Sequence, residues 1–273
     1  MALCWKAGGS KGTFNIDDVS YASAAAAGLD GGLTVTGASV GTKQGFSIIK
    51  ATGSNSQNSF KHGLGKVPKF VIAKDTDNTR AWYIYHGSLG ANYRASFDTT
   101  EFTSDSAYFG SGMTDTLVTL KSGGSGGNNY NGADMIYYVW ADVPGLQKFG
   151  QFTANASGNG PFVELGFRPS ILWVKASSSA GDMTYASWLI VDGERSPTNV
   201  VNKALWANKS AAEGKRGNGS DSYTDAWLDI LSNGFKIRYD GTDVNGTSGQ
   251  TYIYCAWAEA PFHNLYGAQS NAR

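Results

Sequence analysis

Short apolar runs separated by polar turns are the main pattern along the chain. The runs are rich in Val, Ile, Tyr, Trp and Phe, and clusters of Gly, Asn, Ser and Asp lie between them. This pattern is typical of strands in a β-sandwich or jelly roll. Pro68 and Pro169 each come just before such a run, where the missing N–H costs no ladder hydrogen bond. In the first half, the pattern predicts strands at Phe46–Lys50, Lys69–Lys74, Ala81–Tyr85, Arg94–Asp98, Leu117–Lys121 and Met135–Trp140.

Three blocks of the first half recur in the same order in the second half. Leu64–Lys74 matches Leu165–Lys175, Ala81–Gly87 matches Ser187–Gly193, and Ile136–Pro144 matches Ile253–Pro261. Because the order is kept, the blocks indicate an internal repeat. We therefore expect an all-β protein with two tandem antiparallel β-sandwich (jelly-roll-like) domains, repeat A at residues 45–149 and repeat B at residues 150–273.

Two segments differ from this plan. Residues 1–44 match neither repeat, and Asp18 could cap a short helix over Ser20–Ala27, followed by an extended Gly/Thr/Ser-rich stretch. We expect an N-terminal anchoring arm there, which docks onto a partner through Leu3, Trp5 and Phe14. In repeat B, a helix beginning at Pro197 and a short strand around Ala204–Ala207 are alternatives.

The charge balance excludes some classes of partner. Lys and Arg number 22, as do Asp and Glu, so the formal net charge is zero. Without a basic field, nothing drives the phosphate neutralisation on which nucleic-acid binding depends. Cys4 and Cys255 are the only cysteines, which excludes a disulfide framework. The N-terminus lacks the basic and apolar regions of a signal peptide, so we expect neither secretion by that route nor membrane insertion.

Candidate catalytic groups are sparse. The three histidines are His62, His86 and His263, and no Gly-x-Ser-x-Gly, Walker or His-Glu-x-x-His motif occurs. A glycosidase needs two carboxylates facing one sugar, and the pairs Asp192 with Glu194 and Asp225 with Asp229 are the candidates, although most proteins contain such pairs. We expect a protein that is not an enzyme, with no catalytic residue.

Two Asp-rich segments resemble calcium loops. Residues 75–78 and 240–246 carry closely spaced Asp and Asn, but neither has the carboxylate at the twelfth loop position that an EF-hand requires. We expect no cofactor and no metal site, and a structural calcium ion stays open as an alternative.

Aromatic side chains are the most informative residues. In Ala81–Tyr85 a strand places Trp82 on one face and Tyr83 with Tyr85 on the other, so both faces are apolar. One face of the strand packs in the core of the sandwich. The apolar side chains of the other face must be covered by the second repeat, by another subunit or by a sugar. The candidates for interface or glycan contact are Trp82, Tyr83, Tyr85, Tyr137, Trp188, Tyr252 and Tyr254.

Several motifs together resemble a known family, the tandem β-rich C-terminal module of tail fibres and tail proteins of tailed bacteriophages, especially marine ones. These motifs are His62-Gly63-Leu64-Gly65-x-x-Pro68-x-Phe70-Val71-Ile72-x-Lys74, Trp82-x-x-Tyr85-His86, Tyr138-x-Trp140-Ala141-Asp142-Val143-Pro144-Gly145-x-x-Lys148-Phe149-Gly150, Gly160-Pro161-Phe162-Val163-x-x-Gly166-Phe167-Arg168-Pro169, Ala207-Asn208-x-Ser210-Ala211-Ala212-Glu213, Leu231-Ser232-Asn233-Gly234-Phe235-Lys236-Ile237-Arg238 and Ala258-Glu259-Ala260-Pro261-Phe262.

The resemblance implies a viral structural protein located in the virion and assembled in the host cytoplasm. Its implied function is that of a tail fibre or tail-associated adhesin that contacts a host surface glycan or protein receptor. It also implies a homo-oligomer, a homotrimer by analogy, joined to other virion proteins through residues 1–44. A head fibre or capsid decoration protein and a host-glycan depolymerase are the alternatives.

Overall fold

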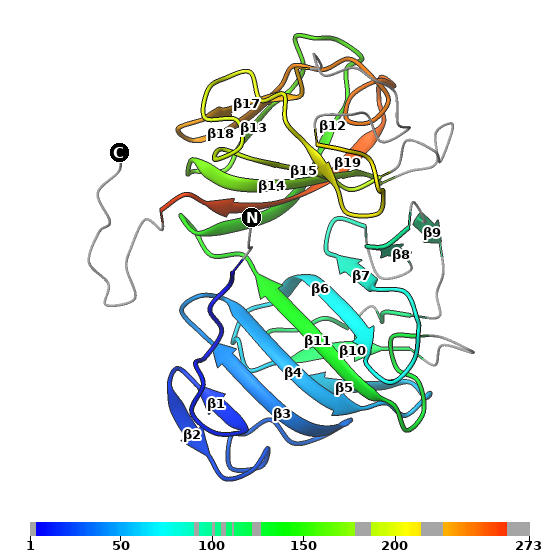
Figure 1. Cartoon of the computed structure of the whole chain (residues 1–273). Helices are drawn as coiled ribbons and strands as arrows, with labels where there is room; N and C mark the ends of the chain where they lie inside the picture. The colour runs from blue at the N-terminus through cyan, green and yellow to red at the C-terminus, as the bar shows by residue number, and fades with distance from the viewer. Residues whose placement is uncertain are drawn as a thin grey trace. The chain divides into compact units, whose positions relative to one another are not determined.

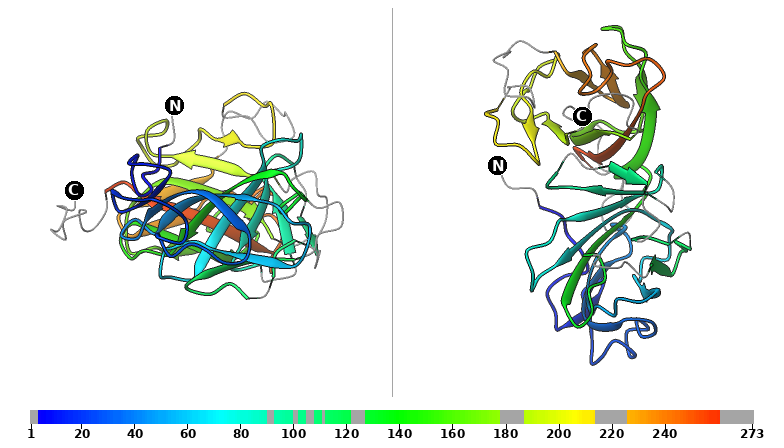
Figure 2. Two further views of the ribbon diagram at one scale, coloured as in Figure 1. Left: turned by 90° about the horizontal axis from the view of Figure 1, so that it is seen from below. Right: turned by 90° about the vertical axis from the view of Figure 1, so that its right-hand side faces the viewer.

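The computed structural model describes residues 4–89, 93–99, 102–104, 108–110, 112–121, 127–177, 187–213 and 226–260. Within these ranges the regular elements are all strands, which confirms the expected all-β class. The chain divides into two compact units, which can be followed in Figure 1 and from two further directions in Figure 2. Unit 1 comprises Met1–Ser96 and Thr103–Val143, and unit 2 comprises Phe97–Phe102 and Pro144–Arg273.

Unit 1 is built on a large sheet whose described strands run in the order β2-β1-β3-β4-β11-β6-β7-β8-β9. A second sheet pairs β10 with β5. The bounds are β1 (Phe14–Ile16), β2 (Val19–Tyr21), β3 (Thr34–Gly41), β4 (Phe46–Thr52), β5 (Asn58–Lys61), β6 (Pro68–Asp75), β7 (Tyr83–His86), β8 (Tyr93–Ser96), β9 (Phe102–Ser104), β10 (Leu117–Leu120) and β11 (Asp134–Ala141). Apolar residues from both sheets, such as Ile49, Phe60 and Tyr137, form one buried cluster, so the unit has sandwich character.

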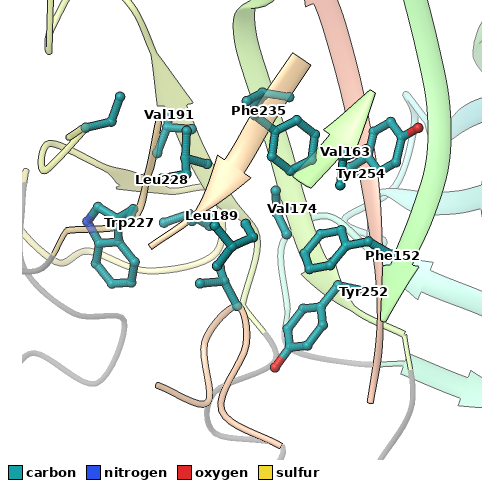
Figure 3. Packing of buried hydrophobic residues seen from close by; sticks show 14 of the residues in the cluster. Phe152, Val163, Val174, Leu189, Val191, Trp227, Leu228, Phe235, Tyr252 and Tyr254 are labelled. Carbon is teal, nitrogen blue, oxygen red and sulfur yellow. The ribbon is translucent and has the colours of Figure 1, made fainter. Parts of the chain in front are cut away.

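Unit 2 has a sheet in the order β12-β19-β14-β15-β16 and a smaller one in the order β13-β18-β17. The bounds are β12 (Gln147–Thr153), β13 (Phe162–Glu164), β14 (Pro169–Ala176), β15 (Leu189–Asp192), β16 (Leu205–Trp206), β17 (Leu228–Leu231), β18 (Gly234–Ile237) and β19 (Thr251–Ala258). Figure 3 shows the core of this unit, in which Phe152 and Val174 from the first sheet meet Phe235 from the second.

The two units repeat one arrangement of strands. The order β4-β11-β6-β7 in unit 1 corresponds to β12-β19-β14-β15 in unit 2, and every neighbouring pair is antiparallel. Trp140 pairs with Phe70 and Trp257 pairs with Ile171, so the aligned residues of the sequence blocks occupy matching register positions. An irregularity in register follows at the same place in both, where Ala141 pairs with Pro68 and Ala258 with Pro169.

The N-terminal residues are integrated into unit 1 instead of forming a separate arm. Strand β3 pairs with β4, and β1 runs parallel to β3 and adds a further strand. Leu29, Leu33 and Val40 are buried in the core cluster of unit 1, so this segment is part of the fold of the unit. The expected helix over Ser20–Ala27 does not form: Ser20 and Tyr21 belong to strand β2, and turns follow, closed by hydrogen bonds such as the one from the Ala27 N–H to the Ser23 carbonyl.

Two further expectations, on the segment after Pro197 and on the boundary between the repeats, can be compared with the structure. The ambiguous segment after Pro197 has no helix, and a short strand, β16, forms at Leu205–Trp206. The change from unit 1 to unit 2 comes between Val143 and Pro144, ahead of β12, whereas the expected boundary at residues 149 and 150 cuts this strand.

Candidate functional site

The candidate site lies on the outer face of the large sheet of unit 1, which we define as the face opposite to the core. Val71 and Ala73 of β6 point into the core, so Lys74 and Ile72 point to the outer face. The Lys74 Nζ lies 6.0 Å from the ring centroid of Trp82, which places this indole on the same face. Trp82 is 37 % exposed, one of the few large apolar side chains that reach solvent.

A row of side chains runs from Trp82 across the sheet. Ile136 of β11 pairs with Lys74 on one side and with Lys50 of β4 on the other. Directly opposed residues of neighbouring strands share a face, so Lys50, Ile136, Lys74 and Trp82 form one line. We call these four residues the Trp82 row. Strands lie about 4.8 Å apart, which gives the row a length of roughly 14 Å.

Polar groups flank the Trp82 row at the end of the strands. Asp134 follows the alternation of β11 onto the outer face and is exposed, as is Asp77 in the β6–β7 loop. The Asp77 Oδ2 accepts the Asp134 N–H at 2.8 Å, so the two aspartates are held close together. On the other flank of the row, Tyr138 is half-buried next to Ile48.

The loop beside Trp82 is fixed from within. The Lys74 ammonium donates to the carbonyls of Asp75, Asn78 and Arg80 at 2.7, 3.2 and 2.9 Å. The buried Asp75 carboxylate accepts the N–H groups of Asp77 and Asn78 and forms an ion pair with Arg80 at 3.2 Å. These contacts restrain the loop backbone up to Arg80, two residues before Trp82, so this loop loses little conformational freedom upon binding.

Unit 2 contains the same pair in a buried setting. The Lys175 Nζ lies 5.8 Å from the centroid of Trp188, as Lys74 does from Trp82. Trp188 is 0 % exposed, and its ring packs against Phe97 at 5.7 Å. Burial, with a smaller contribution from the charge of Lys209, lowers the pKa of Lys175 to about 7. Of the two equivalent tryptophans, the structure therefore exposes only Trp82.

Most of the other aromatic candidates lie in hydrophobic cores. Tyr85 and Tyr137 belong to the buried cluster of unit 1, and Tyr252 and Tyr254 belong to that of unit 2. Tyr83 packs against the first of these clusters, with its ring 4.8 Å from that of Tyr108. Sequence alternation separates the two faces of each strand but does not say which one is the core, so these five tyrosines do not form an outer surface.

The structure places the described ones of the three residues expected to anchor the arm in different contacts. Leu3 lies outside the described residues. Trp5 makes an edge contact with Trp140, with 5.9 Å between the ring centroids. Phe14 in β1 packs against the core of unit 1. Trp5 and Phe14 therefore contribute to packing within unit 1.

The described histidines act as turn acceptors. The Nδ1 of His62 accepts the Leu64 N–H at 3.2 Å, and the Nδ1 of His86 accepts the Ser88 N–H at the same distance. In repeat B, Asp192 replaces His86 and accepts the Glu194 N–H at 3.1 Å, so the exchange preserves this contact. Burial lowers the pKa of His62, which favours its neutral form. His263 lies outside the described residues.

The carboxylate candidates also have structural partners. Asp192 forms an ion pair with Arg195, and Asp229 accepts from the Arg238 Nε at 2.6 Å. Glu194 is exposed beside Asp192, and Asp225 lies outside the described residues. Within the described ranges, no group of three His, Cys, Asp or Glu side chains could hold a metal ion. No helix among the described residues is long and apolar enough to cross a membrane.

Two buried asparagines hold equivalent loops, and the sequence drew attention only to Asn245, as part of the calcium-loop-like segment 240–246. The Oδ1 of Asn129 accepts the Ser54 N–H, and its Nδ2 donates to the Ser56 carbonyl, at 2.9 and 2.8 Å. Asn245 makes the same two bonds, to the Asn155 N–H and the Ser157 carbonyl, at the same distances. The signal in the sequence is an Asn shortly before the third block in each repeat, which is hidden because Asn is common in solvated turns.

No curated protein and no solved structure matches the chain. A family model does match, and it spans residues 2–261, which includes all the described strands of both units. The chain therefore belongs to the family described as a domain of unknown function, DUF7483.

Proposed function

We propose that the protein is a structural component of a bacteriophage virion, a tail fibre or tail-associated adhesin that binds the host surface. The motif resemblance is the source of this proposal. The structural observation that carries it furthest is the Trp82 row, in which a restrained loop presents an exposed indole on a broad sheet. Such a surface suits binding, because it offers contact area without a cluster of groups for chemistry.

The polar residues support binding over catalysis. Asp192 and Asp229 are each paired with an arginine, and His62 and His86 accept turn N–H groups. A general acid or base must reach a substrate proton, and these four groups instead hold their own loops. We therefore propose a protein that binds its ligand without cleaving it.

We further propose that the protein is a homo-oligomer, by analogy a homotrimer, located in the virion. Closed symmetry is the common way in which identical subunits cover identical patches. Sedimentation of the purified protein tests this part, and a monomer at micromolar concentration contradicts it. Tyr83 and Tyr85 are poor positions for disrupting an interface, because both side chains pack in or against the core of unit 1.

The decisive experiment is labelling of whole virions with a gold-conjugated antibody against this protein. Label at the distal end of the tail is the expected result. Label over the capsid would favour the head fibre or decoration alternative, and virions without label would overturn the structural role. Release of reducing sugar from host polysaccharide by the purified protein would replace the binding function with that of a depolymerase.

A further inference from the structure

We infer that the Trp82 row binds a neutral polysaccharide chain, with one sugar ring stacked on the indole of Trp82. This inference rests on the proposed adhesin function and names its ligand class and binding residues.

The first argument comes from the two equivalent tryptophans. Trp188 is fully buried, and the ring of Phe97 packs against it at a centroid distance of 5.7 Å. Trp82 has the same lysine neighbour but is 37 % exposed. The exposed indole leaves apolar area in contact with water, and covering that area is favourable. A flat ligand with an apolar face can cover the part of the Trp82 side chain that is exposed.

The second argument comes from charge. The Trp82 row and its flank contain two lysines, Lys50 and Lys74, and two aspartates, Asp77 and Asp134. Their formal charges cancel, and the Lys74 ammonium already has three carbonyl partners. A polyanion such as a uronic-acid polymer or a nucleic acid gains little from this balance. A neutral ligand suits a surface on which the formal charges cancel.

The third argument comes from the alternation of apolar and polar groups. A pyranose ring has C–H groups on its faces and hydroxyl groups around its edge, so it needs an aromatic surface with both donors and acceptors beside it. Trp82 supplies the surface for one ring, whereas Lys50, at the other end of the row, and Asp134, on its flank, supply a donor and acceptors for other rings of the chain. Since the row is roughly 14 Å long, it favours an extended chain over a single sugar.

A protein partner fits the same surface less well. A specific protein interface buries about 800 Å² on each partner, with an apolar centre from which charged residues are depleted. The Trp82 row offers one exposed indole and one half-buried isoleucine, with Lys50 at its other end. The apolar part is too narrow for such a centre.

The test is affinity electrophoresis of the full chain in native gels that contain one soluble polysaccharide each. Dextran, mannan, laminarin and a galactan are the neutral probes, and alginate is the acidic probe. We expect at least one neutral probe to slow the protein and alginate to have no effect. For the retarding probe, Trp82→Ala should raise the Kd at least about tenfold, whereas Trp82→Tyr, which keeps an aromatic ring, should retain most of the affinity.

Phe162→Ala is the matched control, because Phe162 is an aromatic side chain of β13 that is 46 % exposed but lies outside the Trp82 row. It should leave the affinity unchanged. Thermal unfolding of each variant verifies that it folds. The inference is overturned if no neutral probe slows the protein, if alginate slows it more strongly, or if Trp82→Ala retains full affinity. Gold label at the tail tip together with any of these outcomes would leave the adhesin function standing without this ligand.

Discussion

Asn129 and Asn245 are equivalent residues that hold equivalent loops with the same pair of hydrogen bonds. Each accepts one backbone N–H and donates to the carbonyl two residues further along the chain. The loops also share an unusual backbone, since Asn55 and Ala156, which are not glycines, both have a positive φ, of 50° and 52°. The side-chain amide thus stabilises a strained turn in each unit.

Removing either amide should therefore destabilise the protein. In Asn129→Ala or Asn245→Ala, one N–H and one C=O of the turn lose their buried side-chain partner, and we expect a loss of about 1–3 kcal/mol in the free energy of unfolding. Urea unfolding measures this loss. Asn131→Ala, at an exposed position nearby, should change stability by less than about 0.5 kcal/mol. Equal stability of all three variants would mean that the amides do not hold the loops.

The N-terminal strands should be essential for unit 1. Leu33 is buried in its core, so Leu33→Ala should cost about 2–5 kcal/mol. Val19 is exposed on β2, and Val19→Ala serves as the control with a change below about 0.5 kcal/mol. Deletion of residues 1–44 should give a product that does not show cooperative thermal unfolding of unit 1. A deletion product with an unchanged melting curve would indicate a separate arm.

Lys175 should make stability depend on pH in the alkaline range. Its pKa is lowered by burial to about 7 in the folded chain, whereas an unfolded lysine titrates near 10.4. Between these values the unfolded chain holds a proton that the folded chain lacks, so the free energy of unfolding rises with pH from about 7 to about 10. In Lys175→Met this rise should be smaller. The control Lys203→Met, at an exposed position, should keep it, and an unchanged slope in Lys175→Met would contradict the assignment.

Two tyrosines should reverse this trend at higher pH. Burial raises the pKa of both Tyr137 and Tyr252 above the ordinary value, with smaller contributions from the charges of Asp75 and Asp243. Above pH of about 10 the unfolded tyrosines lose protons that the folded ones keep, so the free energy of unfolding falls. Urea unfolding across this range should give a maximum of stability near pH 10, and a continuous rise would contradict it.

Asp192 should stabilise unit 2 through its ion pair with Arg195 and two turn hydrogen bonds. Its carboxylate is fully buried and accepts the N–H groups of Glu194 and Arg195. Asp192→Ala removes the acceptor of both turn N–H groups and leaves the mostly buried Arg195 guanidinium only the more distant Glu213 carboxylate, at 3.8 Å, so we expect a cost of about 3 kcal/mol. Asp192→Asn keeps an acceptor for the turn, so it should cost less. Glu194→Ala is the exposed control, and denaturant midpoints rank the three variants.

The strands near the middle of each repeat were predictable, and those near the N-terminus were not. In β6 the continuous apolar run Phe70–Ala73 reveals the strand, because residues on both of its faces are buried. In β3 both Val35 and Ala38 are buried, because a register irregularity between Val35 and Gly37 shifts the alternation. With Gly, Ala, Ser and Thr around them, these positions lack the bulky side chains that identify a strand.

The candidate site was predictable only in part. Alternation correctly placed Trp82 on the face opposite to Tyr83, but the exposure of Trp82 and the burial of its counterpart Trp188 depend on tertiary contacts. The Trp82 row also depends on which strands are neighbours. Lys50 and Ile136 are distant in sequence and meet only because β4 pairs with β11.

The inclusion of Phe97–Phe102 in unit 2 limits how this fold can be divided. Phe97 packs against Trp173 and Trp188, yet it follows directly on β8 of unit 1. A gene fragment that encodes only residues 144–273 therefore omits a ring that belongs to the packing of the unit it encodes. Recombination between related genes would keep both units intact only by exchanging them together, so we expect the pair to be inherited as one module.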